Sequence, residues 1–194
     1  AENGDVVYAI GRGAWDVNIF RYREGTTTRI TNDLGSIGGE IPLWYMNESP
    51  KTDGTNIAYI KREYRFSGGS GASSLYIKTN SQEVQLTPFL ANAAFQYELN
   101  NGWTAYTKPG TTNENQIWLR SPSGTTEQTT FFSTSSQILA LAPNGELLFR
   151  NGNRSYSYQK GKSPVELPST LLKPIYVNNQ WYADLCGKRG RYTD

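Results

Sequence analysis

The chain has 194 residues, of which 37% are hydrophobic and 19% are charged, and its formal net charge is +2. A chain of this length can bury a sizeable core, and we expect one domain over residues 1–194. The small net charge argues against a polyanionic partner, and no apolar run approaches the ~18 residues that a membrane helix needs.

The start of the chain and its cysteine content bear on the compartment. Residues 1–11 lack a basic start followed by an apolar stretch, so we expect no signal peptide within the chain. The chain begins at Ala1, which fits either signal cleavage or a fragment. Cys186 is the single cysteine, so the chain has no intrachain disulfide. This does not argue against secretion, because many bacterial secreted proteins of this size fold without disulfides. We expect a secreted or cell-surface bacterial protein.

The first predicted strands come before residue 32. They occupy residues 5–11, 18–23 and 24–31. The second of them alternates cleanly, so Ile19, Arg21 and Arg23 share one face of the strand. Phe20 and Tyr22 share the opposite face.

From residue 41 onward one order of segments recurs: an apolar strand, a polar turn, a second strand, an alternating third strand and a β-branched fourth. Asp53–Gly54, Asn101–Gly102 and Asn144–Gly145 favour tight hairpin turns, whose central residues need positive φ, and Asn178–Asn179 takes the same place in the last repeat. The first strands of the four repeats are predicted at 41–47, 93–99, 137–142 and 173–178. In the first three of these repeats the third strands are predicted at 74–79, 116–121 and 154–159, and the fourth strands at 81–87, 123–130 and 162–168.

This recurrence predicts an all-β fold. Gly54, Gly102 and Gly145 lie roughly 40–50 residues apart, which matches a β-propeller made of four-stranded antiparallel blades. Incomplete repeats at both ends leave four or five blades, or a fragment of a larger propeller. A β-sandwich is the alternative, although it does not explain why the same order of segments returns.

The repeat resembles the TolB-type (WD40-like, PD40) propeller repeat. The resemblance rests on Ser49–Pro50 with Asp53–Gly54, then Ile57-Ala58-Tyr59, then Leu75–Tyr76, then a terminal Leu86–Thr87. It covers nearly the whole chain, with Lys51–Thr52 as an insertion in the turn. It implies a propeller that serves as a binding module, without fixing the ligand.

The residue types exclude several chemistries. The sequence has no histidine, which removes Ser-His-Asp and Cys-His nucleophile systems and most zinc sites, so we expect no metal and no cofactor. Asp53 alone cannot form a calcium loop. Glycoside hydrolysis needs two carboxylates, which leaves a small carbohydrate-active or lectin-like propeller as the alternative function. The candidate acids are Asp16, Glu40, Glu48, Glu98 and Asp184.

Aromatic residues make up 13% of the chain and provide the candidate binding residues. We expect Trp44, Trp103, Trp118 and Phe149 to pack in the core. Aromatic and basic residues near turns are candidates for contacts with a protein or a glycan: Trp15, Tyr64, Phe66, Arg62, Arg65 and Trp181. Basic residues between aromatics can bind single-stranded nucleic acid, but the small net charge disfavours it. We expect a non-catalytic binding module, monomeric or part of a longer chain.

Overall fold

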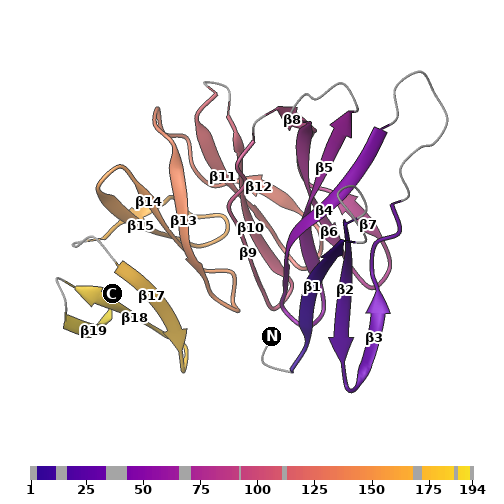
Figure 1. The fold of residues 1–194 in the computed structure, drawn as a ribbon. Helices are drawn as coiled ribbons and strands as arrows, with labels where there is room; N and C mark the ends of the chain where they lie inside the picture. The colour runs from indigo at the N-terminus through magenta and orange to yellow at the C-terminus, as the bar shows by residue number, and fades with distance from the viewer. Residues whose placement is uncertain are drawn as a thin grey trace. The chain divides into compact units, whose positions relative to one another are not determined.

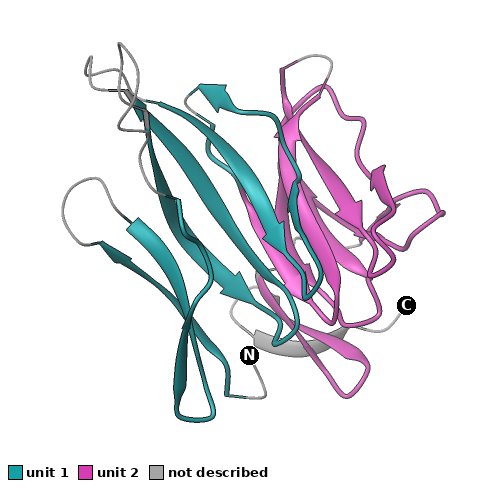
Figure 2. Cartoon of the chain, turned by 90° about the vertical axis from the view of Figure 1, so that its right-hand side faces the viewer, with its two compact units in different colours: residues 1–95 teal, residues 96–194 magenta. Residues whose placement is uncertain are grey.

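The structure is a computed structural model, and it describes residues 4–11, 17–33, 43–65, 71–91, 93–110, 113–167, 172–185 and 188–192. The elements formed by these residues are all strands, which confirms the all-β prediction. The chain divides into two compact units, residues 1–95 and 96–194, coloured teal and magenta in Figure 2.

Unit 1 holds one sheet with the strand order β1-β2-β4-β5-β6-β7, in which β3 also pairs with β2 and β8 with β6 (Figure 1). The neighbours are antiparallel except β2 and β4, which meet in parallel at a single pair, Val17 and Met46. The strands are β1 (Val6–Gly11), β2 (Val17–Arg23), β3 (Thr26–Arg29), β4 (Leu43–Thr52), β5 (Ile57–Arg65), β6 (Ala72–Lys78), β7 (Glu83–Gln85) and β8 (Leu90–Ala91).

Unit 2 holds three sheets in chain order. Each is an antiparallel meander in which sequence neighbours pair. The first contains β9 (Tyr97–Asn100), β10 (Trp103–Pro109), β11 (Asn115–Arg120) and β12 (Thr126–Gln128); the second contains β13 (Ser136–Leu141), β14 (Leu147–Asn151), β15 (Arg154–Tyr158) and β16 (Val165–Glu166); the third contains β17 (Leu172–Val177), β18 (Gln180–Leu185) and β19 (Lys188–Tyr192).

Apolar side chains pack consecutive strand groups against each other within each unit. In unit 1, Ile19 of β2 lies in one buried cluster with Ile57 and Tyr59 of β5. In unit 2, Ile117 of β11 and Phe149 of β14 share a cluster, so the first two sheets of that unit are packed together. The core prediction for Phe149 is confirmed, because its side chain is fully buried.

The end of the fourth segment recurs in detail. A buried threonine hydroxyl accepts a hydrogen bond from the backbone N–H of an apolar residue on the third strand. The three pairs are Thr31 with Ile19 (2.9 Å), Thr87 with Leu75 (2.9 Å) and Thr130 with Ile117 (2.8 Å). In the next repeat Leu167 N–H still reaches the Ser155 carbonyl, but residue 168 is a proline, which has no hydroxyl.

Replacing Thr130 with valine should lower the free energy of unfolding by about 1–3 kcal/mol, because the buried Ile117 N–H and Gln116 side-chain oxygen each lose their threonine hydroxyl partner. Thr125→Val, at an exposed hydroxyl in the same unit, is the matched control and should change the free energy of unfolding little. Urea denaturation measures both. Equal stability of the two variants would contradict the structural role of this threonine.

The fourth strands are shorter than predicted, and three further details differ from the predicted elements. Ser49 and Pro50 lie in a β-bulge within β4, not in the turn, since Glu48 pairs with Ile60 and Lys51 already pairs with Ala58. The strand predicted from residue 93 begins at Tyr97. Strand β8 was not predicted, because two residues give no periodicity to detect.

Candidate binding site

The hairpin formed by β2 and β3 presents a polar face. Its two-residue turn holds Glu24 at φ 49° and Gly25 at φ 79°, as a type I′ turn requires. Arg23 lies opposite Thr26 across the hairpin, and Arg21 lies opposite Thr28. Because directly paired residues point to the same side of a sheet, two arginines and two threonines share this face.

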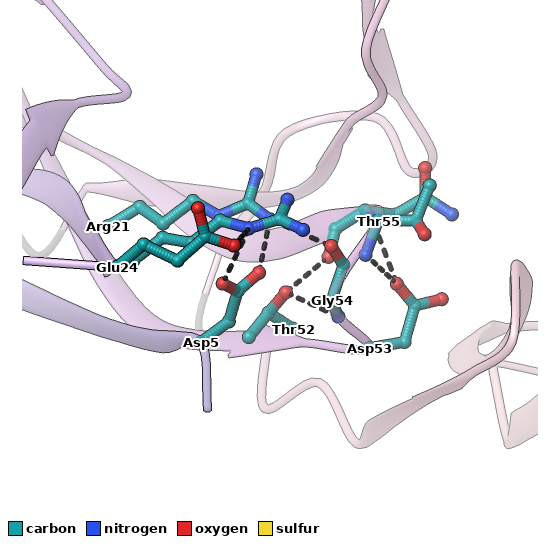
Figure 3. Close-up of polar contacts among 9 residues, drawn as sticks. Asp5, Arg21, Glu24, Thr52, Asp53, Gly54 and Thr55 are labelled. Carbon is teal, nitrogen blue, oxygen red and sulfur yellow. Dashed lines mark hydrogen bonds and ion pairs between the residues drawn. The ribbon is translucent and has the colours of Figure 1, made fainter. Parts of the chain in front are cut away.

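Asp5 holds the two arginines in place. Its side chain has no exposed surface, it forms an ion pair with the Arg21 guanidinium, and its Oδ1 lies 3.4 Å from Arg23 Nε. Arg23 Nε also lies 3.7 Å from Glu24 Oε1. Figure 3 shows the Asp5 carboxylate beside the Arg21 guanidinium. The two cations are therefore balanced by two anions.

Arg21 also ties the hairpin to the turn between β4 and β5. Its Nη2 donates to the Gly54 carbonyl at 2.7 Å. The turn itself is held by side-chain hydrogen bonds: Asp53 Oδ1 accepts from the N–H groups of Thr55 and Asn56 at 2.9 and 2.7 Å. Figure 3 shows this carboxylate directed back into its own turn. Asp53 is thus a turn residue, as the sequence predicted.

A hollow of about 320 Å³ lies over this face. Its volume is at the lower end of the range of about 300–1,000 Å³ for small-molecule sites. Arg23 keeps 47% of its side-chain surface exposed, so a ligand can reach it. The residues that line the hollow are Arg21, Arg23, Glu24, Thr26, Thr28 and Ile30.

A second polar cluster in unit 1 is occupied by its own members. Lys61 Nζ lies 3.0 Å from Asp33 Oδ2 and 4.6 Å from the centroid of the Tyr76 ring, and Asn47 Nδ2 donates to the same carboxylate at 3.1 Å. Lys61 is 8% exposed. Burial, with a contribution from Asp33, raises the pKa of Glu83. We infer that this cluster anchors the segment after β3 to the sheet.

The predicted site residues Arg62 and Tyr64 lie within β5. They are two residues apart on one strand and so share a face. Arg62 Nη2 lies 3.3 Å from Glu48 Oε2, so the structure brings one predicted cation and one candidate acid together as an ion pair. Neither residue lines the hollow.

Trp181, a candidate for ligand contact because it lies near a turn, is buried. The turn at Asn178 and Asn179, with φ 50° and 59°, ends before Gln180, so Trp181 is the second residue of β18. It is 4% exposed, and its ring packs edge-on against Tyr176 with the centroids 4.8 Å apart.

The other predicted residues have partial or no description. Arg65 ends β5, but its side chain lies outside the described part. Glu98 lies in β9, and burial together with its carboxylate raises the pKa of the adjacent Tyr97. Asp184 lies in β18, with its side chain outside the described part. The predicted residues that lie outside the described ranges altogether are Trp15, Asp16, Glu40, Phe66 and Cys186.

The sequence did contain a signal for the hollow. The alternation of residues 18–23 places Arg21 and Arg23 on one face. What it could not reveal is Asp5, whose carboxylate meets them only after β1 pairs with β2.

Comparison with known proteins adds no assignment: no family model matches the sequence, and a search of curated proteins finds no match. In the described ranges no three Asp, Glu, Cys or His side chains are grouped to hold a metal ion. Among the same residues, no helix has the length and apolarity to span a membrane.

Proposed function

We propose that the chain is a non-catalytic binding module of a secreted or cell-surface bacterial protein, with its sheets as blades of a TolB-type β-propeller. Two observations support the proposal that the sheets are propeller blades. The sheets are meanders in chain order, three or four strands at a time in unit 2. The threonine bond to the third strand also recurs in three successive repeats.

The ligand that best fits the hollow is a neutral saccharide, and the observation that carries this is the balance of charge. Arg21 and Arg23 are matched by Asp5 and Glu24, so the site offers no net charge to attract an anion. Guanidinium and hydroxyl groups can donate to sugar oxygens, Glu24 can accept from sugar hydroxyls, and the half-buried Ile30 provides an apolar contact for the ring.

The same residues support binding over hydrolysis. A glycosidase places two carboxyl groups about 5–9.5 Å apart on either side of the bond. Glu24 is the acid among the described residues that line the hollow. The neighbouring acid, Asp5, has a side chain with no exposed surface and is held by two arginines, so it cannot reach a bound sugar.

Arg23→Ala should weaken binding of the preferred neutral glycan at least tenfold, which is about 1.4 kcal/mol, because its exposed guanidinium lines the hollow. A glycan array with neutral and acidic glycans identifies the ligand, and isothermal titration measures it. Arg154→Ala is the matched control, since Arg154 also pairs with a glutamate, Glu166, but on another sheet. Preference for acidic glycans, or equal loss in both variants, would contradict this proposal.

A further inference from the structure

Strand β1 lacks a neighbour that its counterparts have. The second strand of each later repeat, β5, β10, β14 or β18, pairs with an apolar first strand on one side and with the third strand on the other. In the first repeat β1 takes the place of that second strand and pairs with β2. Across the described residues, nothing pairs with its other edge.

The direction of the backbone groups of β1 follows from the bonds of β2. Ile19 N–H donates to Thr31 Oγ1, and the Ile19 carbonyl accepts from Ile30 N–H, so the Ile19 groups point toward β3. Backbone groups alternate along a strand, so Phe20 points toward β1 and bonds Tyr8, its partner. The residues on either side of Tyr8 therefore direct their N–H and C=O groups to the open edge: Val7 and Ala9, with Gly11 two residues further on.

This edge carries none of the features that usually block pairing. Such features are charges, proline, bulges or very short length. All residues from Val6 to Gly11 pair in regular register with β2, and none is charged or a proline. The first strands of the later repeats differ: β4, β13 and β17 contain bulges, β17 also contains Lys173 and Pro174, and β9 contains Glu98.

We propose that the open edge of β1 binds an extended, uncharged strand of a partner polypeptide by β-augmentation. The exposed side chains set the chemistry of that strand. Val6 is 52% exposed and Ile10 is 42% exposed, and they lie on one face with Tyr8, so apolar residues at alternate positions of the partner would cover them. On the other face Val7 is half-buried against the cluster of Ile19, Ile57 and Tyr59, and the exposed, small Ala9 and Gly11 leave room for partner side chains. This inference does not depend on the saccharide proposal.

The test uses a fluorescent peptide that copies residues 43–47, the uncharged part of the chain's own strand β4 that precedes its bulge. Anisotropy titration should show saturable binding to the whole chain. Ala9→Pro should weaken binding at least tenfold, because it removes an N–H that points to the open edge and leaves the β1–β2 bonds in place. Ala9→Ser keeps the N–H and should bind as the parent does. Circular dichroism checks that both variants fold.

Two forms of the peptide, each N-methylated on one alternating set of amides, give a second readout. One set faces β1 and the other faces away, so one methylated peptide should bind and the other should not. The proposal is overturned if the parent chain binds no peptide at millimolar concentration, if Ala9→Pro binds equally well, or if both methylated peptides bind alike. A parent dimer that Ala9→Pro converts to a monomer in sedimentation would identify a second copy as the occupant and also overturn it.

Discussion

Replacing Gly145 with alanine should be among the most destabilising single changes in unit 2. Gly145 has φ +85°, and a Cβ placed on it would lie 2.5 Å from Cε2 of Trp103. The left-handed backbone costs a non-glycine residue about 1–3 kcal/mol, and overpacking costs about 1–3 kcal/mol more. Trp103 cannot easily move aside, because it packs against the cluster of Ile117 and Phe149. Urea denaturation should show the sum of these two losses in the free energy of unfolding.

A matched glycine separates the two causes. Gly152 has φ +57°, and a Cβ there would meet nothing within 4 Å. Gly152→Ala should therefore lose the backbone part alone. Gly145→Ala in a Trp103→Leu background should recover part of its own loss, because the smaller side chain removes the overlap. Equal losses at Gly145 and Gly152 would contradict the contact with Trp103.

The elements that the sequence predicted well are those whose signals are local. The Asp53–Gly54 turn is one, because the Asp53 side chain bonds the N–H groups of its own turn. The Ser49–Pro50 bulge was missed because the same two residues are common in turns, and their place depends on the pairing of β4 with β5. This pairing cannot be read from the local amino-acid composition.

The candidate site shows the same limit. Alternation predicted that Arg21 and Arg23 share a face. Their charge is balanced by Glu24 in the adjacent turn and by Asp5, which precedes β1 and is distant in sequence. Composition near turns suggested Trp181, which proves to be buried because the turn before it takes just two residues. The open edge of β1 could be recognised only from the full strand order, because an edge is open when no other described strand pairs with it.

Unit 2 should lose stability steeply between pH 10 and about pH 12. Burial raises the pKa of Tyr106 from its ordinary value of 10 to about 12. Burial, together with the hydrogen bond from Tyr158 to Glu127 at 2.6 Å, raises the pKa of Tyr158 to about 12. The unfolded chain releases both protons near pH 10 while the folded chain keeps them, so the free energy of unfolding falls as pH rises.

The size of this effect follows from the two shifts. Each unit of pKa corresponds to about 1.4 kcal/mol, so Tyr106, raised by about two units, gives a loss of roughly 2–3 kcal/mol by pH 12, and Tyr158 adds a smaller loss because solvent screens part of its shift. Urea denaturation at stepped pH measures the loss, and tyrosinate absorbance reports when each group ionises. Stability present below pH 10 is lost as pH passes through the folded-state pKa values.

Two phenylalanine variants assign the alkaline loss to particular residues. Tyr106→Phe removes one titrating group, so its stability should fall less between pH 10 and pH 12 than that of the parent chain, and the remaining loss comes from Tyr158 and from Tyr97, whose pKa burial also raises. Tyr22→Phe is the control, since Tyr22 is 44% exposed and lies in unit 1. An unchanged profile in Tyr106→Phe would mean that the Tyr106 hydroxyl ionises as easily in the folded chain as in water, and its burial would then not set the alkaline limit of unit 2.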